Sequence, residues 1–147
     1  MIAYVDSSLL SRAYIPDEDG HDTARAVVMR EDVALVTGRI TRLEVSGALV
    51  RAARAGRHGP ATLTLAKLDD DLGPGGPVVE VDPPAGDVEE RALALVREHG
   101  LRALDALHLA VASIVLPQLA DKGEPLGFAS RDGDQATVAE ALGFARV

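Results

Sequence analysis

The chain has 147 residues and 47% hydrophobic content, which is typical of one domain, and it has no cysteine, which excludes disulfides and thiolate metal sites. Its 23 acidic residues outnumber 15 Lys and Arg and give a net charge of −8, which disfavours a broad basic surface for nucleic acid. No segment has the roughly 18 apolar residues of a membrane span, and the start does not match a signal peptide, so we expect a soluble, cytoplasmic domain over residues 1–147.

The first half of the chain alternates between apolar runs and helical patterns. The expected elements are a strand over 2–5, a helix over 21–30, a strand over 33–37, and helices over 39–55 and 60–72. The helix over 39–55 is marked by apolar residues at helical spacing and ends before Gly56, and Pro60 suits the start of the next one. This order favours an α/β fold.

The second half continues the alternation. The expected elements are a strand over 78–81, a helix opened by a capping box of Asp87 and Glu90 and ended by Gly100, an apolar helix from 103 to about 115, a strand over 126–130, a helix over 137–142 and a short strand over 144–147. Pro117 should end or kink the apolar helix. Alternating strands and helices predict a three-layer α/β/α fold with a central parallel sheet of four to five strands.

Two acidic residues lie just past the ends of predicted strands, where ligands of such sheets bind. Asp6 follows the first strand and Asp132 follows the strand over 126–130. The first strand is followed neither by the Gly-x-Gly-x-x-Gly motif of a Rossmann domain nor by the Gly-x-x-x-x-Gly-Lys-Ser/Thr motif of a P-loop protein. Ser8 stands where a haloacid-dehalogenase-type phosphatase has a second Asp, and the paired acids of a receiver domain are absent. A carboxylate with neighbouring hydroxyls at this edge indicates a cation site.

Two further acidic residues lie in helical segments where a structural role is awkward. Glu44 lies in the helix over 39–55, and Asp105 interrupts the most apolar helix of the chain. Buried Asp is rare unless it is paired or binds a metal. The alternative for Asp105 is a helix cap or a buried salt bridge with Arg102, and the residue alone does not decide between them.

Four motifs in this order resemble those of a known family. They are Tyr4-Val5-Asp6-Ser7-Ser8-Leu9-Leu10, Thr41-Arg42-Leu43-Glu44-Val45, Leu104-Asp105-Ala106-Leu107-His108-Leu109-Ala110 and Ser130-Arg131-Asp132. The chain resembles PIN-domain ribonucleases, and more narrowly the VapC toxins of bacterial toxin–antitoxin modules. The resemblance covers nearly the whole chain and implies that Asp6, Glu44, Asp105 and Asp132 form the acidic quartet, with Ser8 and Ser130 at the hydroxyl positions.

A cluster of four carboxylates favours a hard divalent cation, because such a cation relieves the repulsion between the acids. The predicted cofactor is Mg²⁺ or Mn²⁺, and the predicted chemistry is in-line attack on a phosphodiester by water that the metal activates. The resemblance alone implies RNA as the substrate, a homodimer, and a cognate antitoxin that occupies the acidic site. The alternatives are a PIN-like module that binds RNA or a partner without cleaving, and a metal-dependent phosphatase of small substrates.

Other polar residues are weaker candidates. Arg51 and Arg54 lie within about 80° of Glu44 on the predicted helix and are candidates for RNA binding, although a solvated helix face explains them as well. His108 is better explained as a hydrogen-bonded core residue than as a ligand. Asp134 competes with Asp132 for the last position of the quartet but also fits a loop before a helix.

Overall fold

A parallel sheet of five strands forms the centre of the computed structural model, which describes residues 1–147. The strand order is β3-β2-β1-β4-β5, and every neighbouring pair is parallel. The strands are β1 (Ile2–Val5), β2 (Ala34–Gly38), β3 (Val78–Val81), β4 (Leu126–Ala129) and β5 (Ala145–Arg146). The predicted parallel sheet is therefore confirmed, with β1 in the middle.

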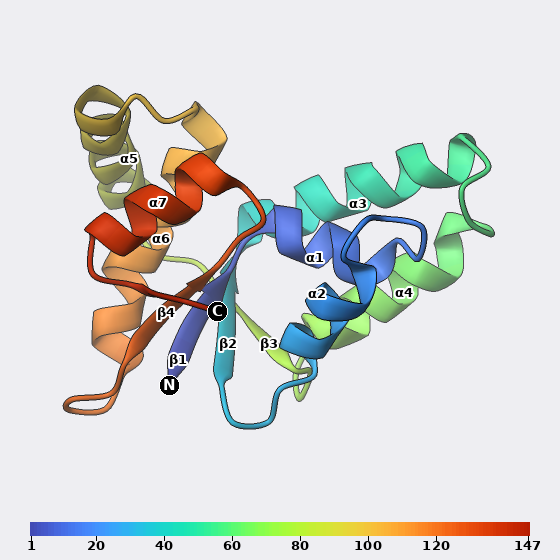
Figure 1. The fold of residues 1–147 in the computed structure, drawn as a ribbon, viewed down its shortest axis with the longest axis horizontal. Helices are drawn as coiled ribbons and strands as arrows, with labels where there is room; N and C mark the ends of the chain where they lie inside the picture. Colours follow the sequence, from blue (N-terminus) through green and yellow to red (C-terminus); the bar gives the residue numbers. More distant parts are fainter.

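Seven helices cover the sheet on its two faces (Figure 1). The helices on one face are α1 (Ser7–Tyr14), α2 (His21–Val28), α3 (Arg39–Arg54) and α4 (Ala61–Asp71). Those on the other face are α5 (Ala85–His99), α6 (Ala103–Leu119) and α7 (Gly133–Ala141). The molecule therefore has the predicted three layers. None of its helices has the length and apolar character needed to span a membrane.

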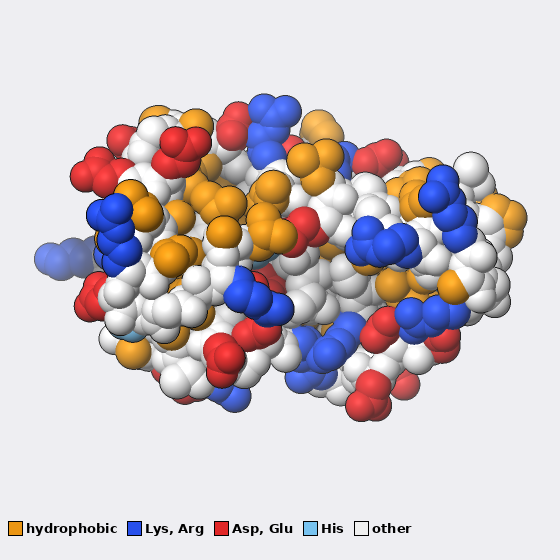
Figure 2. Space-filling model, turned by 90° about the horizontal axis from the view of Figure 1, so that it is seen from above, with side chains coloured by type: hydrophobic (Ala, Val, Ile, Leu, Met, Phe, Trp, Pro, Cys, Tyr) orange, Lys and Arg blue, Asp and Glu red, His pale blue; other side chains and the backbone are white.

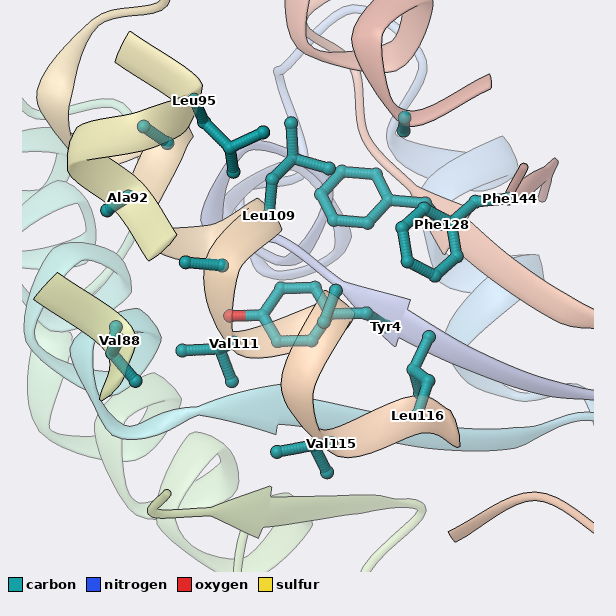
Figure 3. Close-up of a cluster of buried hydrophobic side chains, with 14 of the residues drawn as sticks. Tyr4, Val88, Ala92, Leu95, Leu109, Val111, Val115, Leu116, Phe128 and Phe144 are labelled. Carbon is teal, nitrogen blue, oxygen red and sulfur yellow. The ribbon is translucent and has the colours of Figure 1, made fainter. Parts of the chain in front are cut away.

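Two hydrophobic clusters, one on each face, hold the layers together. Ala3 and Val5 of β1 belong to the cluster under α1 to α4, whereas Tyr4 belongs to the one under α5 to α7. The Tyr4 ring stacks on that of Phe128, with 5.4 Å between ring centroids, and both lie beside Leu109 of α6 (Figure 3). Since β1 is buried on both faces, the residue that follows it emerges in the middle of the protein.

Two helices begin within a few residues of the end of a strand, at positions that the sequence analysis did not predict. Helix α1 was missed, and α7 begins at Gly133 instead of residue 137. Asp6 and Asp132 are their N-caps, and their side chains accept hydrogen bonds from the backbone N–H groups of Leu9 and Gln135, both at 3.0 Å. These caps explain the early starts, because each satisfies a free N–H of the first helical turn.

Three other predicted boundaries are wrong. Helix α5 begins at Ala85 after Pro84, without a side-chain cap, so Asp87 and Glu90 form no capping box. Helix α6 continues through Pro117 to Leu119, because a proline in the last turn loses only one hydrogen bond while the helix stays packed on the core. Strand β5 has two residues instead of four.

Candidate functional site

The four predicted acidic residues line one cavity at the carboxyl ends of the strands. Asp6 follows β1, Glu44 lies in α3, Asp105 lies in the first turn of α6, and Asp132 precedes α7. The cavity has a volume of about 340 Å³ and is lined by Asp6, Ser7, Ser8, Glu44, Arg102, Ala103, Leu104, Asp105 and Asp132. Figure 2 shows this edge from above, with acidic and basic side chains next to each other in the middle and hydrophobic side chains beside them.

Asp6 is the most deeply buried acid of the site, with 2% of its surface exposed. Its carboxylate accepts hydrogen bonds from the Leu9 backbone N–H at 3.0 Å, from Ser8 Oγ at 2.9 Å and from Ser130 Oγ at 2.8 Å. Burial raises the pKa of Asp6, although these hydrogen bonds and the nearby His108 partly oppose the rise. An ionised Asp6 is therefore costly unless a cation approaches it.

The two predicted serines hold Asp6 against the loop after β4. Ser8 Oγ accepts a hydrogen bond from the Arg131 backbone N–H, and Ser130 Oγ accepts one from that of Asp132, both at 2.9 Å. Ser130 Oγ also lies 2.7 Å from the side-chain oxygen of Gln135. The hydroxyls thus connect the ends of β1 and β4.

Gln135 is a buried polar residue that the sequence analysis missed. It is completely buried, and its amide nitrogen donates to the backbone carbonyl of Asp105 at 3.1 Å. Together with its contact to Ser130, this bond joins α7, α6 and the end of β4. The only signal in the sequence is its place three residues after the cap Asp132.

Glu44 is held by a chain of buried hydrogen bonds. His108 is 1% exposed, and its Nε2 lies 2.7 Å from Glu44 Oε2. The Tyr4 hydroxyl accepts a hydrogen bond from the Gly38 N–H at 3.1 Å and donates to His108 Nδ1 at 2.8 Å. In the neutral imidazole the proton is therefore on Nε2, which donates to Glu44. The interpretation of His108 as a hydrogen-bonded core residue is confirmed.

The link to His108 keeps Glu44 ionised. Burial by itself raises the pKa of Glu44, but the interaction with His108 outweighs burial and the pKa is lowered. Glu44 therefore presents a charged carboxylate to the cavity at neutral pH. His108 lies three residues after Asp105 in α6, but its partner Glu44 comes from α3.

Arg102 already binds two of the four acids. Its Nε donates to Asp105 Oδ2 at 2.7 Å, and its Nη2 donates to Asp132 Oδ2 at 2.6 Å. The Arg102 side chain is 74% exposed, whereas those of Asp105 and Asp132 are 16% and 27% exposed. The salt bridge considered as an alternative for Asp105 is present, and the link to Asp132, 30 residues away, was not foreseen.

Comparison with known proteins places the chain in a family. The model of the PIN domain family matches residues 3–141. The chain belongs to the PIN domain family. This PIN domain is similar in fold to two solved structures, and a comparison with curated protein sequences gave no significant match.

The two solved structures share the fold of this PIN domain at low sequence identity. One is Mycobacterium tuberculosis VapC20, described as a toxin that cleaves the sarcin-ricin loop, with a TM-score of 0.64 and 22% identity over 99% of this chain and 98% of that chain. The other is a toxin–antitoxin complex from Klebsiella pneumoniae, with a TM-score of 0.52 and 20% identity over 88% and 86% of the two chains. The family predicted from the four motifs is confirmed.

The donor chemistry of this PIN domain fits a hard divalent cation. The four acids supply only carboxylate oxygens, which Mg²⁺ and Mn²⁺ prefer. No three acidic or histidine side chains are grouped closely enough to form a ready metal site. Arg102 instead binds Asp105 and Asp132, and His108 binds Glu44. The guanidinium of Arg102 shows that a cation is accepted between two of these acids.

The remaining candidates lie outside the acidic cavity. Asp134 lies in the first turn of α7 and does not line the cavity. Arg51 lines an adjacent groove of about 500 Å³, whose wall includes Ser8 and Arg12. Arg54 lines neither space. The structure thus brings Arg51, but not Arg54, next to the site.

Proposed function

We propose that residues 1–147 form one metal-dependent endoribonuclease domain that acts as the toxin of a toxin–antitoxin pair. The observation that carries the proposal is the meeting of Asp6, Glu44, Asp105 and Asp132, from four separate elements, around one cavity. Membership of the PIN domain family supports hydrolysis of phosphodiesters. The descriptions of the two similar structures, one a toxin that cleaves the sarcin-ricin loop and the other a toxin–antitoxin complex, support RNA as substrate and an antitoxin as partner.

The residues of the chain supply a rigid anionic site. Ser8 and Ser130 orient the buried Asp6, and His108 orients Glu44 and keeps it ionised. Asp105 and Asp132 complete the acidic lining of the cavity. When bound, Mg²⁺ or Mn²⁺ would activate the attacking water and offset negative charge on the phosphate. One or two cations satisfy this assignment.

Removal of divalent cations is expected to stop RNA cleavage. The purified protein should cleave RNA with Mg²⁺ or Mn²⁺ and leave it intact in EDTA, because without a cation the four carboxylates repel the phosphate backbone. Gel analysis of a structured RNA substrate measures this, and excess Mn²⁺ should restore cleavage. The Asp105→Asn variant controls for contaminating nucleases. Cleavage that persists in EDTA would refute the metal requirement.

Arg51 is expected to hold the RNA backbone beside the cavity. It makes no ion pair within the protein, and its groove shares Ser8 with the acidic cavity. The Arg51→Ala variant should raise the KM for RNA about three- to tenfold with little change in kcat, since only a phosphate contact is lost. Arg54→Ala is the matched control on the same helix. Equal KM values for wild type and both variants would contradict the RNA-binding role.

We also infer that the protein is a homodimer, that a cognate antitoxin regulates it by covering the acidic cavity, and that it is located in the cytoplasm. The similarity to the complex from Klebsiella pneumoniae supports an antitoxin as partner. Light scattering of the purified protein tests the dimer, and co-purification with the product of a neighbouring gene tests the antitoxin.

A further inference from the structure

Arg102 is the one basic residue among those that line the acidic cavity. It stands at the N-cap of α6, and its own side chain makes no capping bond. Its guanidinium instead reaches into the cavity and donates to one oxygen each of Asp105 and Asp132. With 74% of its side chain exposed, no packing holds it there, so the two carboxylates alone fix its position.

We propose that Arg102 is a resident counter-ion that occupies the cation site of the metal-free protein and must leave Asp105 and Asp132 when a divalent cation binds. The inference rests on the proposed function, because it concerns the same acidic site. It adds a competition within the chain that sets the affinity of the protein for the metal.

The competition follows from the oxygens that Arg102 uses. It takes Oδ2 of both carboxylates, and Oδ1 of Asp132 already accepts the cap bond from Gln135. A cation that binds both acids therefore competes with Arg102 for Oδ2 of Asp132, because the metal ion and the guanidinium carry like charge and would share this oxygen. Two exposed ion pairs are weak enough for a divalent ion to displace, and the exposed side chain can swing into solvent.

An ordinary structural role for Arg102 would have a different consequence. If the two ion pairs only fastened α6 to the start of α7, their loss would lower stability and leave metal affinity unchanged or weaker. The counter-ion role requires the opposite change in affinity. Metal binding measured without RNA separates the two roles and does not depend on activity.

The first test is a titration of the metal-free protein with Mn²⁺, in which electron paramagnetic resonance measures the bound and free ion. Arg102→Gln should lower the Kd for Mn²⁺ about fivefold or more relative to wild type. Arg146→Gln is the control, because Arg146 also forms an exposed ion pair, with Glu140 at 2.9 Å, and its loss changes the net charge equally. Its Kd should stay within about twofold of wild type.

The second test detects the release of Arg102 directly in the wild-type protein. The Nε–H proton that donates to Asp105 should give a shifted arginine signal in the nitrogen-15 NMR spectrum, and saturating Mg²⁺ should move it to the position of free arginine. Arg102→Gln identifies the signal. An unmoved signal, or a Kd equal in wild type and Arg102→Gln, overturns the counter-ion role alone. Absence of Mn²⁺ binding in every protein overturns both this role and the metal dependence of the proposed function.

Discussion

Replacing Asp6 by asparagine is expected to lower kcat for RNA cleavage by about 10²- to 10³-fold or more. Asp6 is the most buried carboxylate of the cavity, and its charge is the part of the side chain that a divalent cation needs. The substitution keeps the shape and the acceptor for the Leu9 N–H, so the cap of α1 survives. The hydroxyls of Ser8 and Ser130 can rotate to accept from the new amide nitrogen.

The same substitution is expected to stabilise the metal-free protein at neutral pH. Burial raises the folded-state pKa of Asp6, so the folded protein holds this proton to a higher pH than the unfolded chain. Stability is therefore lost as the pH rises from the unfolded to the folded pKa, and the loss remains above it. Asparagine never ionises and avoids this cost. At pH 7.5 in EDTA, the Asp6→Asn variant should have a Tm about 2–4 °C above wild type.

Thermal denaturation in EDTA and RNA cleavage measure the two effects on the same samples. The gain in Tm should shrink as the pH falls below the folded pKa of Asp6 and disappear below the unfolded pKa of Asp, where Asp6 is protonated in both states. Asp134→Asn is the control, because Asp134 lies outside the cavity and should leave cleavage unchanged. Wild-type cleavage by Asp6→Asn would remove Asp6 from the catalytic set, and a large fall in Tm would show that its charge is structural.

The sequence predicted the features that depend on neighbouring residues. Apolar runs gave the strands, and Asp6 and Asp132 could be placed at one edge because parallel strands end on the same side. Helix α1 was missed because it begins directly after β1, and Asp6-Ser7-Ser8 resembles a turn as much as a capped helix. Local patterns do not distinguish the two.

Contacts between distant segments could not be predicted from the sequence. The link from Arg102 to Asp132 spans 30 residues, and that from Glu44 to His108 spans 64. Both depend on how helices pack across the sheet edge, which residue spacing within one helix does not determine. The four motifs located the acids and the sequence offered Arg102 as a partner of Asp105, but the groups that hold Glu44 and Asp132 became visible only in three dimensions.

Substitutions of His108 should separate its effects on stability and on catalysis, because its two ring nitrogens have different partners. Glutamine can place a donor near the position of Nε2, and asparagine can place an acceptor near that of Nδ1. His108→Gln therefore keeps the bond to Glu44 and removes the acceptor of the Tyr4 hydroxyl. His108→Asn does the reverse.

His108→Gln is expected to lose mainly stability, and His108→Asn is expected to lose mainly activity. The Tyr4 hydroxyl is completely buried, so losing its acceptor in His108→Gln should cost about 2 kcal/mol, or about 4–8 °C in Tm, while kcat stays near wild type. The Glu44 side chain is 25% exposed, so water can solvate it in His108→Asn, with a smaller loss of Tm. Its carboxylate is then no longer oriented, and kcat should fall about tenfold.

Melting temperatures and kcat values of the two variants, measured with saturating Mn²⁺ for kcat, test this separation. Tyr4→Phe provides the matched control, since it removes the hydroxyl that needs the acceptor and leaves the bond from His108 to Glu44 in place. Adding His108→Gln to Tyr4→Phe should therefore cost less stability than adding it to wild type. If both His108 variants lose stability and activity in parallel, His108 is a packing residue and does not position Glu44.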